Sequence, residues 1–150
     1  MSLAGLARNL LWLTLVCVAC NSDVPVPAST TLPQGAVFTI TRVATHPFLA
    51  RYNLRLTVRG EAGCQAEAEL FPDTGRVSRR NLYRVADTMY YVVGQYDARV
   101  VDLDRCRITL TEFHVLETGT TFLGSFDENE GREWVFLSAS QRPERLFEKR

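Results

Sequence analysis

The chain has 150 residues, of which 46% are hydrophobic and 23% are charged, so it suits one globular domain with a core of useful size. Its 17 Lys and Arg residues are balanced by 17 Asp and Glu residues. This neutrality excludes the strongly basic surface that is expected of a nucleic-acid-binding protein.

The first 19 residues have the organisation of a secretion signal. One arginine, Arg8, precedes an apolar run from Leu10 to Ala19. Such a run suits the export machinery but is shorter than the about 20 apolar residues that span a bilayer. Residues 1–19 are therefore predicted to be a removable signal peptide and not a transmembrane helix.

The end of this segment, Val18-Ala19-Cys20, resembles the lipobox of bacterial lipoproteins. The resemblance implies cleavage before Cys20, lipidation of Cys20 with fatty-acyl chains such as palmitate, and a lipid-anchored protein in the cell envelope that faces the periplasm. Asn21 stands where retention in the inner membrane would favour Asp, so the outer membrane is preferred. Cys17 occupies a position that is usually aliphatic in lipoboxes, and the alternative is ordinary cleavage to a soluble secreted or periplasmic protein.

Residues 20–35 contain several prolines and small polar residues without a periodic apolar face, which predicts a flexible tether on the lipid anchor. Residues 36–140 are expected to form a β-domain. Residues 141–150 are expected to be a charged tail, in which Pro143 could open a short helix.

Cleavage before Cys20 leaves two cysteines that carry no lipid, Cys64 and Cys106. In an oxidising compartment this even pair predicts a disulfide bond. Each cysteine also falls in register with the apolar residues of a strand candidate, so both thiols are expected to face the core. A bridge that closes a loop of about 43 residues would stabilise the fold by roughly 4 kcal/mol.

The stretch from Leu82 to Phe113 is dense in Tyr, Val, Ile and Thr and is interrupted by short polar breaks, which predicts successive antiparallel strands at the centre of the domain. Residues 53–59 alternate between apolar and polar side chains, and Pro72 to Gly75 predict a hairpin turn. Further strand candidates are 36–43, 64–71, 121–126 and 134–139. The predicted fold is all-β: a small antiparallel up-and-down barrel of eight to nine strands, or alternatively a two-sheet β-sandwich.

Catalytic motifs are scarce in this sequence. It contains only His46 and His114 as histidines and no nucleophile elbow, zinc-protease motif or phosphate-binding glycine loop. We therefore expect no cofactor, no metal and no enzyme activity. The alternative is a carboxylate-dependent envelope hydrolase that uses Asp102, Asp104 or Glu112.

Two charged stretches are candidate binding sites. One is a cationic stretch that could bind an anionic partner, since arginine makes two-point contacts with phosphate; its residues are Arg76, Arg79, Arg80 and Arg84. The other is the acidic loop 127–131, which could contact a protein through Asp127, Glu128 and Glu130. The leading prediction is a non-enzymatic, lipid-anchored β-domain that binds a partner or ligand in the cell envelope. Two alternatives remain open: the hydrolase described above, and an inhibitor or immunity-type lipoprotein that blocks an enzyme through the acidic loop.

Overall fold

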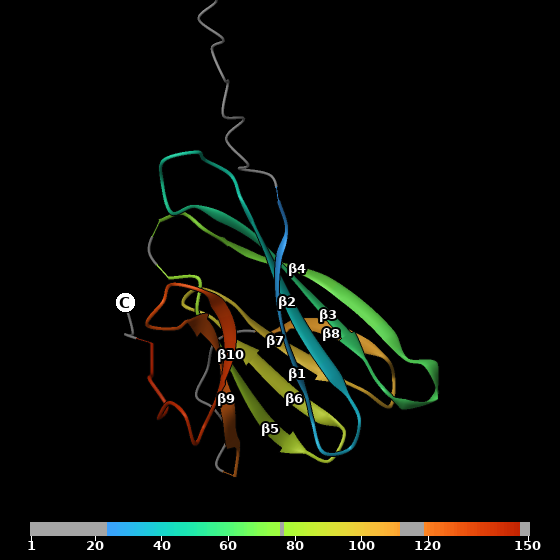
Figure 1. Cartoon of the computed structure of the whole chain (residues 1–150). Helices are drawn as coiled ribbons and strands as arrows, with labels where there is room; N and C mark the ends of the chain where they lie inside the picture. Colours follow the sequence, from blue (N-terminus) through green and yellow to red (C-terminus); the bar gives the residue numbers. More distant parts are fainter. Residues whose placement is uncertain (1–23, 76, 112–118, 148–150) are drawn as a thin grey trace, which may run out of the picture.

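The computed structural model describes residues 24–75, 77–111 and 119–147. These residues form ten strands in two antiparallel sheets, so the all-β prediction is confirmed (Figure 1). This part of the chain has no helix with the length and hydropathy to cross a membrane.

The first sheet contains, in spatial order, β1 (Val26–Thr31), β2 (Val37–Ala44), β3 (Tyr52–Arg59) and β4 (Gln65–Asp73). The second sheet contains, in spatial order, β10 (Trp134–Ser138), β9 (Thr121–Glu128), β5 (Arg80–Ala86), β6 (Met89–Val93), β7 (Ala98–Asp102) and β8 (Arg107–Thr111). A single 3-10 turn, η1 (Glu61–Gly63), lies between β3 and β4 in the described chain.

The two sheets form a sandwich, so the barrel was the wrong choice and the alternative is correct. β1 lies beside β10 and β4 beside β8, but neither pair forms a ladder that would close a barrel. The expected hairpin at residues 72–75 is instead a crossing from one sheet to the other. The Asp73 side chain accepts hydrogen bonds from the Gly75 backbone N–H (2.9 Å) and the Ser78 hydroxyl (2.6 Å), and these bonds redirect the chain.

The strand order also breaks the expected meander, because β9 pairs with β5 and not with β8. Alternation of apolar and polar residues is the same in a barrel and in a sandwich. The sequence pattern could therefore give the strands but not the way in which the sheets close.

The core lies between the inner faces of the two sheets, where side chains from both interdigitate. The Phe38 and Tyr90 rings meet edge to face across it, with centroids 5.2 Å apart. Fully buried residues include Phe38, Ile40, Leu54, Leu56 and Val58 from the first sheet and Leu82, Tyr90, Val92, Val101 and Phe126 from the second. The predicted alternation of β3 is confirmed, with Leu54, Leu56 and Val58 inward.

The segment expected to be a tether contains the first strand. β1 pairs with β2 from Val26 to Thr31, and Ala28 and Leu32 are buried in the core. Pro27 is compatible with this strand because β1 is an edge strand of its sheet, where a missing amide proton costs no ladder hydrogen bond. The prediction of a tether over 20–35 was therefore wrong for 26–31, and the folded domain begins before Ala36.

The C-terminal segment is also part of the folded domain as far as Phe147. Residues 143–147 do not form the short helix that Pro143 suggested. Instead the segment lies on the outer face of the second sheet, where the Tyr83 hydroxyl donates to the Glu144 carboxylate (2.8 Å) and the Asn81 amide donates to the Arg145 carbonyl (3.0 Å). Burial raises the pKa of Tyr83 above its usual range, so this phenol remains a donor at all ordinary pH values.

Candidate functional site

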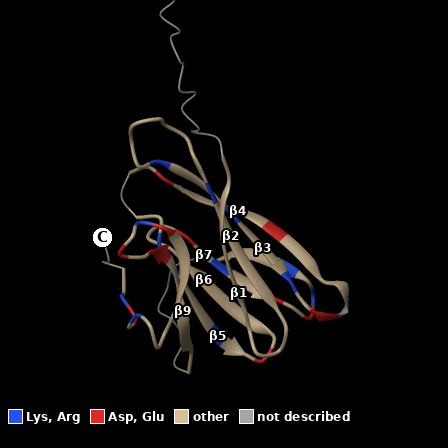
Figure 2. Ribbon diagram, viewed as in Figure 1, with Lys and Arg blue, Asp and Glu red and all other residues tan. Residues whose placement is uncertain are grey.

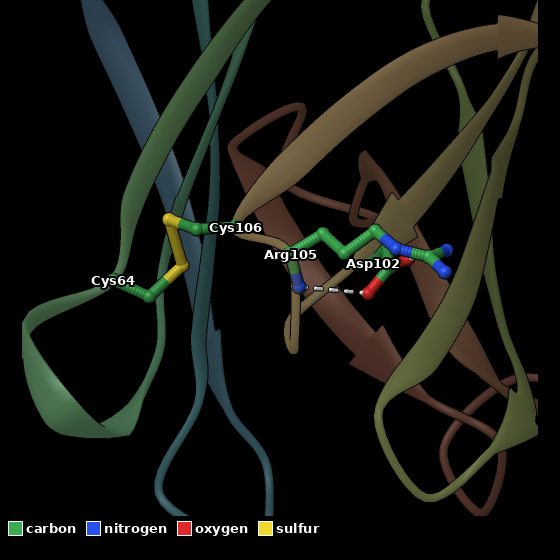
Figure 3. Close-up of a disulfide and its surroundings, with 4 residues drawn as sticks. All are labelled: Cys64, Asp102, Arg105 and Cys106. Atoms are coloured by element: carbon green, nitrogen blue, oxygen red, sulfur yellow. Dashed lines mark hydrogen bonds and ion pairs between the residues drawn. A yellow bond between two sulfur atoms is a disulfide. The ribbon is translucent and has the colours of Figure 1, made fainter.

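The predicted disulfide between Cys64 and Cys106 is present, with Cα atoms 5.4 Å apart (Figure 3). Cys64 immediately precedes β4, and Cys106 ends the turn between β7 and β8, where its backbone has a φ of 48°. Both residues are half-buried and lie just outside the strands that were expected to contain them. The bond joins a turn of the first sheet to a turn of the second.

Four turns gather around this bond at one end of the sandwich. The register of β2 and β3 pairs Val37 with Arg59, which brings the β1–β2 turn beside the β3–β4 turn. The Leu103 N–H donates to the Thr88 carbonyl (2.9 Å), so the β7–β8 turn is held to the β5–β6 turn as well. We call this set of turns, residues 32–36, 60–64, 87–88 and 103–106, the braced end.

The candidate catalytic carboxylates have separate partners. Asp102 accepts hydrogen bonds from the backbone N–H of Arg105 (3.0 Å) and from its guanidinium (3.1 Å), as Figure 3 shows for the backbone bond. Asp104 accepts instead from the Thr88 hydroxyl (2.7 Å). The backbone hydrogen bond from Arg105 lowers the pKa of Asp102, whereas a general acid needs a raised pKa. Glu112, the third candidate, lies outside the described residues.

Most of the exposed side chains at the braced end are charged, and Figure 2 marks the charged positions along the ribbon. Glu61, Asp87 and Asp104 are exposed, and the Arg105 side chain is 72% exposed. Their backbones are fixed by the disulfide and by the hydrogen bonds between turns. The braced end therefore presents polar groups on a rigid base.

The opposite end of the sandwich is where the described chain begins. Val26 pairs with Arg42 near the end of β2, and Arg42 donates to Glu128 at the end of β9 (2.6 Å). The β2–β3 loop (45–51), the described parts of the β4–β5 connection (74–75 and 77–79), the β6–β7 turn (94–97) and the β9–β10 turn (129–133) all lie on this side. We call it the entry end (Figure 1).

The predicted cationic binding stretch does not form an exposed site. Arg80 is 3% exposed and donates to the backbone carbonyls of Phe71 (2.7 Å), Ser78 (3.1 Å) and Arg79 (3.0 Å). Its guanidinium lies 3.4 Å from Asp97, which is also buried. Burial lowers the pKa of Arg80, and the Asp97 charge opposes that effect. Arg80 therefore links β4 to β5 across the sheets and is not available to a partner.

The other arginines of this stretch are dispersed. Arg79 is 8% exposed because Phe147 covers it, with the guanidinium 4.4 Å from the ring centroid. Burial, and next the charge of Arg145, lower the pKa of Arg79. Arg84 is exposed on β5, and Arg76 lies outside the described residues. The prediction of one anion-binding surface was therefore wrong for Arg79 and Arg80.

The predicted acidic loop is largely occupied by ion pairs. Asp127 and Glu128 belong to β9, where Asp127 binds Arg142 (2.6 Å) and Glu128 binds Arg42 (2.6 Å). Glu130 is exposed in the β9–β10 turn. Of the three acidic candidates, Glu130 alone is fully available at the surface.

Two residues that are structurally important, Arg42 and Asp97, were not identified from the sequence. The Arg42 guanidinium lies between the Tyr52 ring (4.6 Å) and the Trp134 ring (5.0 Å), and Asp97 accepts the Phe71 N–H (2.9 Å). Arg42 could have been found, because it continues the inward register of Phe38 and Ile40 along β2. Asp97 had no such signal, since a turn carries no alternation.

The histidines have no catalytic partners in the described structure. His46 lies in the β2–β3 loop, where its Nδ1 accepts two backbone N–H groups, and His114 lies outside the described residues. Within the described residues, no three His, Cys, Asp or Glu side chains converge as a metal site would require. No family model, curated protein or solved structure matches this chain.

Proposed function

We propose that the protein is an exported, lipid-anchored β-sandwich that binds a protein partner in the bacterial cell envelope through its braced end and performs no catalysis. The observation that carries the proposal is the disulfide, which fixes turns of both sheets at the end opposite the chain entry.

Export is supported by the disulfide together with the first 20 residues. Disulfides persist in the periplasm and outside the cell, whereas the cytosol keeps thiols reduced. The lipobox-like Val18-Ala19-Cys20 provides the route, and Asn21 favours the outer membrane. Acylation at Cys20 would leave Cys64 and Cys106 to pair with each other, as they do.

The orientation follows from the short sequence between the lipid and the fold. Only three residues separate Cys20 from Val24, and four Cα–Cα steps span at most about 14 Å. The entry end would therefore face the membrane. The braced end would point into the periplasm, where a partner could reach it.

Binding through turns suits this architecture. Loops positioned on a rigid sheet scaffold carry binding sites more often than the sheets do, and antibody variable domains bind with the loops at one end of a β-sandwich. The likeness to antibodies is one of arrangement alone. A lowered pKa at Asp102 and the separate partners of Asp102 and Asp104 favour this function over hydrolysis.

A matched pair of charge reversals tests the proposed surface. Glu61 and Glu130 are both exposed, but Glu61 lies at the braced end and Glu130 at the entry end. We expect Glu61→Arg to weaken capture of envelope proteins by at least about tenfold, because a tenfold loss is about 1.4 kcal/mol and like charges at an interface cost several kcal/mol. We expect Glu130→Arg to leave capture unchanged. Equal capture by the two variants would reject the braced end as the partner surface.

A further inference from the structure

The β2–β3 loop is the most apolar exposed feature of the described chain. Phe48 is 85% exposed and Leu49 is 48% exposed. Pro47 and Ala50, on either side of them, are exposed as well. A run of four exposed apolar residues is unfavourable in water and marks a surface that meets an apolar environment.

The loop is held in the conformation that exposes these side chains. The Nδ1 atom of His46 accepts the backbone N–H groups of both Phe48 and Leu49, each at 3.1 Å. The Thr45 N–H donates to the Arg51 carbonyl (2.9 Å) and closes the base of the loop. These hydrogen bonds within the loop fix its conformation in the free protein, and in this conformation the Phe48 and Leu49 side chains are exposed.

The tip lies beside the point where the chain enters the fold (Figure 1). Val26 pairs with Arg42, so the same register continued backward places Val24 opposite Ala44, next to the first residue of the loop. Val24 is 50% exposed and Val26 is 41% exposed. Exposed apolar side chains thus lie both at the tip and near the base of the loop, where the described chain begins.

The charge of the loop suits a membrane surface. Residues 45–51 contain no carboxylate, in a chain that has 17 Asp and Glu residues, and Figure 2 shows this tip without acidic residues. Arg51 is exposed at the base of the loop. An apolar tip with a cation behind it matches the boundary between acyl chains and anionic headgroups.

We propose that the tip, residues 47–50, inserts into the interface of the lipid leaflet that holds the acyl chains of Cys20. This inference rests on the proposed lipid anchor, because an anchor within about 14 Å of Val24 brings the tip to the headgroups. Anchor and tip together fix the orientation of the sandwich, whereas an acyl anchor alone would leave it free to rotate.

An indole placed at the tip reports its environment. The full-length gene with Phe48→Trp is expressed in bacteria, and the purified protein is reconstituted in phosphatidylethanolamine and phosphatidylglycerol vesicles with or without brominated acyl chains. The matched control is Gln34→Trp, an exposed position in the β1–β2 turn at the braced end. The buried Trp134 is common to all proteins, so emission is compared with that of the wild type.

We expect the Phe48→Trp protein to show blue-shifted emission and a loss of emission on bromination, and the Gln34→Trp protein to show neither change beyond the wild type. Partition into a detergent phase reports acylation separately. If the protein is acylated but the indole at position 48 is not quenched, insertion of the tip is rejected and the lipid anchor is retained. If the indole is quenched but the protein is not acylated, insertion of the tip is retained and the lipid anchor is rejected. An indole that is shielded by added envelope proteins but not by vesicles overturns the inference in favour of a protein occupant.

Discussion

The two ends of this sandwich are held by different chemistry. At the braced end one covalent bond joins the two sheets, a hydrogen bond from Leu103 to Thr88 adds the β5–β6 turn, and the register of β2 and β3 adds the β1–β2 turn. At the entry end no disulfide occurs among the described residues. The Arg42–Glu128 ion pair and the hydrogen bonds of Phe71 with Arg80 and Asp97 cross between the sheets instead. The braced end therefore depends on an oxidising compartment, whereas the contacts of the entry end can form anywhere.

This difference in chemistry fits the two roles that we propose, partner binding at the braced end and support of the fold at the entry end. A surface that binds a partner gains affinity when its loops are rigid before binding, because less order is lost on association. The disulfide supplies that rigidity where the partner would bind. The entry end supports the fold near the chain entry, and its buried charges are positioned to fix the sheets relative to each other.

The largest expected effect is the loss of the covalent bond. Replacing both cysteines, Cys64→Ser with Cys106→Ser, should lower the free energy of unfolding by about 4 kcal/mol, because the unfolded chain regains the entropy of an open loop. Urea unfolding measures the change, and reduced wild-type protein should behave like the variant. A loss below about 1 kcal/mol would show that the braced end does not need its bond, since it would lie under the usual range for native disulfides.

Removal of the buried carboxylate at the entry end should cost nearly as much. Asp97→Ala leaves the guanidinium of Arg80 without its anion, and breaking such a buried pair costs about 3–5 kcal/mol. We expect the lower value, because Arg80 keeps its backbone acceptors. Asp87→Ala, at an exposed position of the braced end, is the control and should change the unfolding free energy by about 0.5 kcal/mol or less. Equal effects of the two substitutions would contradict the role of Asp97.

The ion pair of Arg42 should matter more than an exposed pair of the same length. Arg42→Met removes a hydrogen bond to Glu128 and two ring contacts, and should cost about 2 kcal/mol. Arg55→Met removes a pair with Glu69 that is also 2.6 Å long but lies in solvent, and should destabilise the fold much less, because exposed ion pairs contribute little. Thermal unfolding compares the two, and similar losses would mean that burial and the rings add nothing at Arg42.

The smallest expected effect is an acid sensitivity of the braced end. The folded state lowers the pKa of Asp102 below its ordinary value of 3.8. The stabilisation is therefore present above the unfolded pKa and is lost as the pH falls through the folded pKa. Melting temperatures of the wild type and Asp102→Asn should differ at pH 6 and converge toward about pH 2. A constant difference across this range would refute the assignment.

The sequence predicted two kinds of feature: strands, which show as a repeating alternation of apolar and polar residues, and the disulfide, for which few pairings of cysteines are possible. Strands β2, β3 and β4 followed from alternation, and the bond between Cys64 and Cys106 followed from an even number of cysteines. The braced end as a surface did not, because it depends on register and sheet stacking. Turn positions alone do not reveal which turns meet.

The charged residues were harder to place for a physical reason. Arg79 and Arg80 are as polar in sequence as Arg84, yet only Arg84 is exposed. An arginine can be buried when backbone carbonyls or an aromatic ring satisfy it, and those partners come from distant segments such as Phe71 and Phe147. Composition therefore suggested a surface patch where the fold makes a contact between sheets.

The most direct test of the account is the mass of the N-terminal peptide of the mature protein, isolated from bacterial envelopes. We predict a chain that begins at Cys20 and carries acyl groups on that residue, with Cys64 and Cys106 joined in the same molecule. A mature chain that keeps residues 1–19, or that begins elsewhere with no lipid, would contradict it.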